Sequence, residues 1–350
     1  MNSLELALNY PFADTMPATG ATMQVAPGIK WLRMPLPFAL NHINLWLLED
    51  DYQGTAGWAI VDCGVCTPEI RAAWETVLAN ELAGKPITRV IVTHMHPDHV
   101  GNADWLCKKL AVPLFMSLTD YAMARSMLTK PSGTGGVQAA AHFEVHGLTS
   151  GEDLNKITQR GNYYGTMVDG LPEHMHRLLG GHRLRIGAHT WRLDAGYGHA
   201  PEHISLYCAA LNVVISGDML LPRISTNISV WDMEPESNPL PLFLDSLAVY
   251  EALPANVLVL PSHGKPFRGA HTRVAQLRDH HADRLAELLA ACQSAPITAA
   301  DAVKIMFKRE LDFHQISFAL GEALAHLHAL WFEGTIKRSK NAAGAWQFSL

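Results

Sequence analysis

The chain has 350 residues, of which 48% are hydrophobic and 17% charged, and its formal net charge is -6. A chain of this size and composition can bury one large domain together with a small one, and its acidic balance argues against a general nucleic-acid binder. It contains no apolar run of about 18 residues and no signal-peptide pattern, so we expect no membrane-spanning helix and a cytoplasmic location.

The first third of the sequence alternates between predicted strands and helices. Residues 1–25 show no periodicity and are expected to form a loose arm. Apolar, β-branched runs predict strands at 29–35, 39–48, 57–61, 87–92 and 112–116. Thr67 followed by Pro68 predicts the start of a helix that ends near Ala83, and a second helix is predicted over 98–110. This order predicts an α/β fold with helices packed outside a sheet.

Residues 117–186 interrupt the alternation. Their apolar spacing and their glycines predict a long, mostly helical insertion. It carries Tyr163 and Tyr164, whose hydroxyl groups are candidate hydrogen-bond donors to a substrate carbonyl, although packing is the more common role of such residues. Insertions beside a cleft often form lids or pockets. We therefore expect this one to cover the site described below.

The segment from residue 190 to 294 returns to short strands. The pattern predicts a strand from 190, strands at 204–210, 213–216 and 257–260, and helices at 245–253 and 272–291. After residue 296 the pattern predicts helices at 297–308 and 313–334, followed by a terminal hairpin at 335–340 and 345–350. The five cysteines are scattered and odd in number, so we expect no disulfide framework.

A cluster of polar residues follows the strand predicted at 87–92. His94, His96, Asp98 and His99 lie within six residues, between that strand and the next helix. In an open α/β fold, sites are built at the carboxyl ends of strands. His94 and His96 are two residues apart on an extended chain, so their rings can face the same side. Imidazole and carboxylate ligands suit zinc, iron or manganese, and this stretch predicts a metal site.

The cluster resembles the signature of the metallo-β-lactamase superfamily, and four further motifs of that family follow the same order. They are Asp62-Cys63-Gly64, the Gly198–His203 loop, Asp218 at the end of a strand, and His263 after another strand. The resemblance covers about residues 25–270 and is closest to glyoxalase II-like hydrolases. The helices and hairpin of the tail resemble a winged-helix module, which one branch of the family carries. We therefore expect a catalytic domain at 1–294, an αββα sandwich, and a small domain at 295–350.

The resemblance implies a ligand set and a reaction. One metal ion would bind His94, His96 and His199, the other would bind Asp98, His99 and His263, and Asp218 would bridge them. Asp98 would also be catalytic, and Asp62 and His203 would support the ligands from behind. Two divalent ions, zinc before iron or manganese, would share a hydroxide that attacks a small ester, thioester or lactone. Tyr163, Tyr164 and Arg223 are the candidate substrate-binding residues.

Other functions fit the sequence less well. A phosphodiesterase or ribonuclease of the same fold is the main alternative, but residues 314–332 contain no Lys or Arg for a nucleic-acid backbone. A flavodiiron protein would have glutamate in place of His96, and a silent binding module would be expected to lose ligands. A serine hydrolase has no support, because the chain lacks a G-x-S-x-G motif. We expect a small-molecule substrate, no membrane or nucleic-acid partner, and a tail that docks on the catalytic domain or in a homodimer.

Overall fold

The computed structural model describes residues 3–38, 40–130, 133 and 135–350. The chain divides into two compact units. Unit 1 comprises Met1–Leu128, Tyr164–Thr226 and Ser246–Val274, and unit 2 comprises Thr129–Tyr163, Asn227–Asp245 and Ala275–Leu350. Each unit therefore combines segments that are far apart in the sequence. The domain boundary that the sequence places between residues 294 and 295 stays a prediction.

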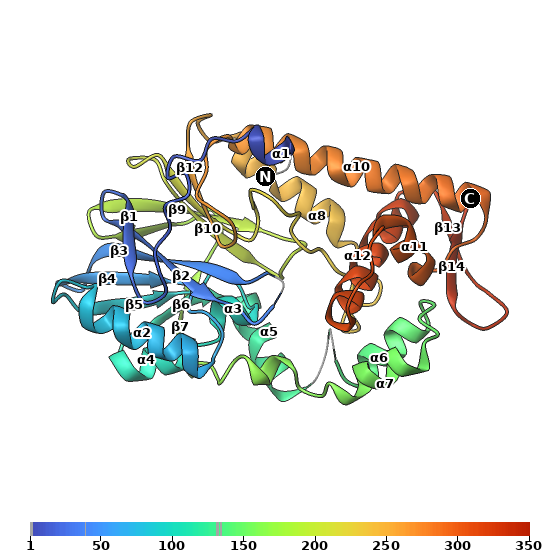
Figure 1. Cartoon of the computed structure of the whole chain (residues 1–350), viewed down its shortest axis with the longest axis horizontal. Coiled ribbons are helices and arrows are strands. Elements are labelled where there is room, and N and C mark those ends of the chain that lie inside the picture. Colours follow the sequence, from blue (N-terminus) through green and yellow to red (C-terminus); the bar gives the residue numbers. More distant parts are fainter. Residues whose placement is uncertain (1–2, 39, 131–132, 134) are drawn as a thin grey trace. The chain divides into compact units, whose positions relative to one another are not determined.

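Unit 1 is built on two mixed β-sheets (Figure 1). The seven-stranded sheet has the order β1 (Thr22–Ala26), β2 (Ile29–Pro35), β3 (His42–Tyr52), β4 (Thr55–Val61), β5 (Ile87–Ile91), β6 (Leu114–Ser117), β7 (Met175–Leu178). The five-stranded sheet has the order β12 (Leu258–Pro261), β11 (Val213–Gly217), β10 (His203–Cys208), β9 (His189–Gly196), β8 (Arg183–Ile186). Strands β4 to β7 run parallel, and so do β11 and β12.

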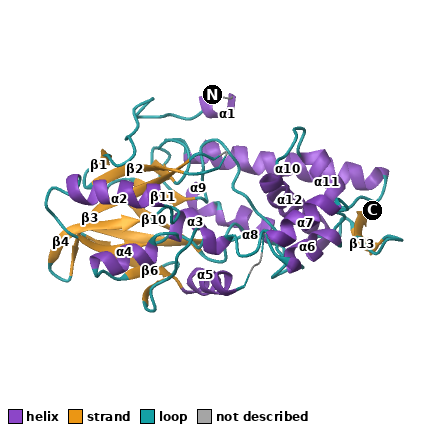
Figure 2. Cartoon of the chain, turned by 60° about the horizontal axis from the view of Figure 1, so that its bottom comes forward, coloured by secondary structure: helices purple, strands orange, loops and turns teal. Residues whose placement is uncertain are grey.

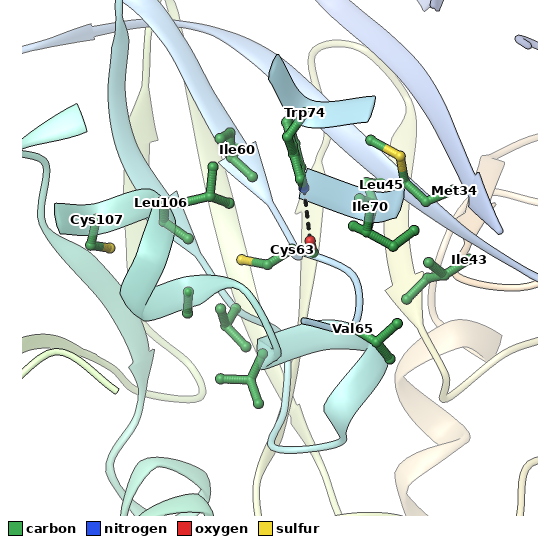
Figure 3. Close-up of a cluster of buried hydrophobic side chains, with 14 of the residues drawn as sticks. Met34, Ile43, Leu45, Ile60, Cys63, Val65, Ile70, Trp74, Leu106 and Cys107 are labelled. Atoms are coloured by element: carbon green, nitrogen blue, oxygen red, sulfur yellow. Dashed lines mark hydrogen bonds between the residues drawn. The ribbon is translucent and has the colours of Figure 1, made fainter. Parts of the chain in front are cut away.

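Apolar side chains cover both faces of the seven-stranded sheet. Trp31, Trp46 and Ile91 on one face pack with Leu193 and Ile215 of the five-stranded sheet. The other face packs against α2 (Pro68–Asn80) and α4 (Ala103–Leu110). Figure 3 shows this layer, in which the indole Nε1 of Trp74 donates to the backbone oxygen of Cys63 at 2.8 Å. All five cysteines are free, as expected.

A helix also covers the outer face of the five-stranded sheet. Tyr250 of α9 (Ala248–Glu251) is buried, and its hydroxyl lies 2.6 Å from Oγ of Ser205 in β10. Helices therefore flank two stacked sheets, and the predicted αββα sandwich is confirmed. The remaining short helices of unit 1 are α1 (Ser3–Leu6), α3 (Pro97–Val100), α5 (Leu118–Thr129) and the 3₁₀ helix η1 (Tyr164–Thr166).

Unit 2 is mostly helical (Figure 2). It contains α6 (Val137–Glu144), α7 (Gly151–Gln159), α8 (Pro239–Ser246), most of α10 (Ala270–Ser294), α11 (Ala299–Met306), α12 (Phe313–Phe332), and the hairpin β13 (Lys337–Lys340) and β14 (Trp346–Ser349). Phe143 and Ile157 pack with Leu320 in its core. Thr298 and Asp301 form a capping box that starts α11. The predicted helices and hairpin of the tail are present, whereas the likeness to a winged helix stays a prediction.

Several predictions about secondary structure were wrong in part. The expected loose arm contains β1, and the expected helical insertion contains β7 and β8. Each is a short strand of four or five residues at or near a sheet edge, with exposed side chains that hide the alternation. The helix expected over 98–110 is divided into α3 and α4. The strand expected from Ala39 begins at His42 instead, and residue 39 lies outside the described residues. In the described ranges, no helix is long and apolar enough to cross a bilayer.

A buried ion pair joins three parts of unit 1. Arg89 of β5 donates to the Asp50 carboxylate of β3 through Nε at 2.9 Å and Nη2 at 2.7 Å, and both side chains are 2% exposed or less. Asp50 also accepts from Thr88 Oγ1 and from the backbone nitrogen of Gly187, which lies between β8 and β9. Burial raises the pKa of Asp50, but these bonds outweigh it and hold the pKa below its usual value.

We predict that Asp50→Ala lowers the free energy of unfolding by about 3–5 kcal/mol, because it leaves the Arg89 charge buried without its partner. Urea denaturation at pH 7 measures this. Since the pKa of Asp50 is lowered on folding, its contribution is complete above the unfolded value of about 3.9 and is lost as the pH falls through the folded value. The double variant Asp50→Leu/Arg89→Met should recover most of the loss. A loss of less than about 1 kcal/mol for Asp50→Ala would contradict the assignment.

Candidate metal centre

The seven predicted ligand residues lie on segments that follow β5, β9, β11 and β12. These strands end at one edge of the sandwich, so polar residues that come after them meet there. The structure brings the seven together in two groups, and the candidate ligand atoms of each group lie within 4.8 Å of one another. The groups are His94, His96, His199 and Asp218, and Asp98, His99 and His263.

Three ring nitrogens converge in the first group. Nε2 of His94 lies 2.9 Å from Nδ1 of His96 and 3.2 Å from Nε2 of His199, and the last two atoms are 3.0 Å apart. Nitrogen ligands of a tetrahedral zinc ion, at about 2.0–2.1 Å from the metal, are roughly 3.3 Å from one another. The spacing and the chemistry of this donor set therefore fit a metal ion.

The carboxylate of Asp218 faces both groups. Its Oδ2 lies 3.4 Å from Nε2 of His199, and its Oδ1 lies 3.4 Å from Nε2 of His99 and 3.4 Å from Nε2 of His263. Nε2 of His263 is also 3.3 Å from Oδ2 of Asp98. Within the described part of the chain, Oδ1 of Asp218 and Nε2 of His99 are buried and take part in no hydrogen bond. Buried polar atoms in this condition are typical of a site that a cation completes.

The two groups differ in their electrostatics. Burial and the neighbouring histidines lower the pKa of His94 well below its usual value and that of His96 to about 3, so both rings are neutral at pH 7. Burial also acts to lower the pKa of His263, but the carboxylates of Asp218 and Asp98 outweigh it and raise this pKa to about 10. The pKa of Asp218 is held well below its usual value, because His263 and His99 outweigh its burial. The first group thus offers neutral nitrogen donors, and the Asp218 carboxylate offers anionic oxygens beside it.

Asp62 and Thr93 contact the ring nitrogens of the predicted ligands His99 and His94 that face away from the centre. Oδ2 of Asp62 lies 2.8 Å from Nδ1 of His99, and Oδ1 accepts from the backbone nitrogen of Thr93 at 2.8 Å. The hydroxyl of Thr93 contacts both carboxylate oxygens and lies 3.1 Å from Nδ1 of His94. A carboxylate behind a histidine fixes the tautomer and turns the other ring nitrogen toward the centre. The supporting role of Asp62 stays a prediction.

His203 lies against the backbone of Asp218. Its Nε2 accepts from the Asp218 backbone nitrogen at 3.2 Å, and its ring centroid is 4.9 Å from that of His94. Gly217 makes this approach possible, since a Cβ there would meet Nε2 of His203 at 2.1 Å. Gly217 also has φ +54°, a conformation that other residues rarely adopt. The supporting role of His203 stays a prediction.

A second close approach, at Gly101, joins the Asp62-Cys63-Gly64 motif to the histidine cluster after β5. Gly101 follows α3, and a Cβ there would meet backbone oxygens of Pro97 and Gly64 at 2.5 and 2.6 Å. The backbone nitrogen of Cys63 donates to the oxygen of His99 at 2.7 Å. Side-chain nitrogen Nδ2 of Asn102 donates to the oxygen of Val65 at 2.6 Å. The loop after β4 and the loop after β5 are therefore fixed to each other through the backbone.

Two residues that hold His263 were missed in the sequence. The backbone oxygen of His42 lies 2.8 Å from Nδ1 of His263, and the His42 ring accepts from the backbone nitrogen of Gly264 at 2.8 Å. Nδ2 of Asn44 donates to backbone oxygens of Pro261 and Gly264. The only signal for His42 was its place at the start of a strand, and its partner is 221 residues away.

The three predicted substrate-binding residues lie in different environments. The hydroxyl of Tyr164 is buried and donates to the backbone oxygen of Met95 at 2.6 Å, so it does not face a substrate. Tyr163 belongs to unit 2, where Arg160 stacks over its ring at 3.7 Å. The Arg223 side chain is exposed, and its Nε lies 3.9 Å from Oε2 of Glu5. Their substrate-binding roles stay predictions for Tyr163 and Arg223, and the geometry gives Tyr164 a different role.

Known proteins resemble this chain over most of its length. The model of the metallo-beta-lactamase superfamily matches residues 40–263, and the model of the metallo-beta-lactamase-like C-terminal domain matches residues 285–350. The crystal structure of a beta-lactamase domain protein from Burkholderia ambifaria is similar with 52% identity and a TM-score of 0.95, over 99% of both chains. A metallo-beta-lactamase family protein from Thermus thermophilus is 29% identical with a TM-score of 0.75, over 93% of this chain and 99% of its own.

A curated relative points to the same chemistry. The probable metallo-hydrolase YqjP of Bacillus subtilis (strain 168) is 22% identical over 324 residues, which are 87% of this chain and 92% of the relative. The superfamily model covers more than half of the chain and includes all seven residues of the two histidine and aspartate groups. The chain therefore belongs to the metallo-β-lactamase superfamily and is a metal-dependent hydrolase.

Proposed function

We propose that the protein is a binuclear hydrolase of small esters, thioesters or lactones, with zinc as the metal before iron or manganese. The position of Asp218 carries this proposal. One carboxylate lies 3.4 Å from His199 through Oδ2 and 3.4 Å from both His99 and His263 through Oδ1. A carboxylate that faces two groups of nitrogen donors with different oxygens is suited to bridge two ions.

When bound, two such ions supply a hydroxide near neutral pH and polarise the carbonyl group that is attacked. The protein residues hold this centre in place. The buried rings of His94 and His96 stay neutral, which is the form that binds metal. Asp62 holds His99 with Nε2 turned toward the centre. We assign the role of catalytic proton acceptor to Asp98, whose side chain is 18% exposed beside His263.

The charge of the protein supports a small substrate more than a nucleic acid. Helix α12 of unit 2 contains no Lys or Arg, and the whole chain carries a formal net charge of -6. Phosphate backbones are bound mainly through basic side chains. Helix α12 therefore offers a phosphate backbone no basic side chain, which weighs against the phosphodiesterase alternative. The predicted homodimer and the docking of the tail stay predictions.

We predict that the purified protein binds two metal ions per chain, measured by elemental analysis after gel filtration. Asp218→Ala should lose at least one ion and lower kcat/KM by about 100-fold or more, because both groups lose a shared oxygen donor. Asp51→Ala at the exposed end of β3 is the control and should keep both ions and full activity. A wild-type protein that is fully active with a single ion would exclude the binuclear model.

The substrate class has its own test. We expect zinc-loaded protein to hydrolyse at least one member of a panel of acyl thioesters, short-chain esters and N-acyl lactones. Its kcat/KM for that compound should exceed that for bis-(p-nitrophenyl) phosphate and for single-stranded RNA by about 100-fold or more, which corresponds to roughly 2.7 kcal/mol. A preference for the phosphodiesters would reverse the assignment of the substrate class.

A further inference from the structure

Met95 lies between two predicted ligands, His94 and His96, and both of its backbone polar groups are held by buried side chains. Its nitrogen donates to Oδ1 of Asp120 at 2.8 Å. Its oxygen accepts from the hydroxyl of Tyr164 at 2.6 Å. Asp120 belongs to α5 and Tyr164 to η1, so two elements distant in sequence fix the orientations of the two peptide units that join His94, Met95 and His96. The directions in which the flanking histidines leave the backbone are fixed with them.

Asp120 also reaches the loop that carries His199. Its Oδ2 accepts from the backbone nitrogen of Glu202 at 2.6 Å. Beside it, the hydroxyl of Thr119 donates to the Glu202 carboxylate at 2.9 Å, which gives the start of α5 a second link to the same loop. The Asp120 side chain is fully buried, and Ser117 Oγ donates to it at 3.3 Å. A single carboxylate therefore connects the loop after β5 with the loop after β9.

The chemistry of the site explains why such a connection matters. The three nitrogens of His94, His96 and His199 lie 2.9–3.2 Å apart. In the tautomers that bind a metal ion all three present lone pairs, which repel one another at that distance. Two loops that carry repelling donors separate unless the scaffold holds them. A carboxylate suits this task, because it accepts two backbone N–H groups at once and its charge strengthens both bonds. Groups behind metal ligands commonly govern metal affinity in this way.

We propose that Asp120 is a positioning residue of the metal centre, which fixes the two loops so that His94, His96 and His199 converge on one ion, and that Tyr164 assists it through Met95. This inference rests on the proposed function, because it assumes that these histidines bind metal. It assigns Tyr164 to the support of the ligands and not to the binding of substrate. Neither residue touches the reacting atoms.

The inference is specific to one of the two ions. The contacts of Asp120 reach the segments of His94, His96 and His199, whereas His263 is held by His42 and Asn44 of β3. Asp120→Asn keeps the size of the side chain, but its amide nitrogen turns a donor toward one of the two backbone N–H groups. We expect one metal equivalent to bind at least about 10-fold more weakly and the other to keep its affinity within about twofold.

The experiment titrates metal-free wild type and variants with zinc against a chromophoric chelator, and then with cobalt while visible absorption bands are recorded. Asp120→Asn should change the intensity of the bands of one cobalt equivalent, because these bands depend on the geometry of the ligands. Tyr164→Phe, which removes one hydroxyl, should act in the same direction with a smaller factor. If Asp120→Asn does not fold, the metal affinity and cobalt spectrum of Tyr164→Phe alone test the inference.

Asp50→Asn is the matched control. Asp50 is also a buried aspartate, but it lies eight residues along β3 from His42, roughly 26 Å away. It should lower stability and leave both metal equivalents and the cobalt bands unchanged. Wild type with two equivalents, together with Asp120→Asn and Tyr164→Phe variants of unaltered affinity and spectrum, would overturn the inference and leave the proposed function intact. Failure of the wild type itself to bind two ions would overturn both.

Discussion

The crowding of three imidazole nitrogens within 3.2 Å of one another is the constraint on which the rest of unit 1 depends. In the tautomers that bind a metal ion, all three nitrogens present lone pairs and repel one another, so the fold must hold them together until a cation does. Burial of apolar side chains in the sandwich stabilises this arrangement. The strands bury nearly all their apolar side chains, and β5, β9, β11 and β12 end at one edge, where the polar loops have little freedom to separate.

The loops are held mainly by hydrogen bonds to backbone groups, and each bond reaches a different motif. Asp62 connects the loop after β4 with Thr93 and His99, and Asn44 connects β3 with the loop that carries His263. Backbone contacts through Gly101 and Gly217 allow distances that any larger residue would prevent. A site that is rigid before the metal binds loses less conformational entropy on binding, and its ligands keep a fixed geometry during the reaction. The Asp50 ion pair secures the sheets in a region that the site does not use.

The sequence predicts the candidate ligands better than it predicts the residues that hold those ligands in place. His94, His96, Asp98 and His99 are recognised because they form a local pattern directly after an apolar strand, and Asp218 and His263 follow strands of the same kind. Asp120 escapes notice, because its partners Met95 and Glu202 are 25 and 82 residues away and are backbone groups of unremarkable residues. Strand β7 was missed for a similar reason. It has only four residues, with the middle two exposed, and its pairing with β6 determines its structure.

The most direct test of the account is a crystal structure of the zinc-loaded protein with anomalous diffraction measured on both sides of the zinc absorption edge. The account predicts two peaks about 3.5–4 Å apart. One should lie among His94, His96 and His199, the other among Asp98, His99 and His263, and Asp218 should contact both. A single peak, or two peaks of which Asp218 contacts only one, would contradict the central claim that this carboxylate unites two metal sites.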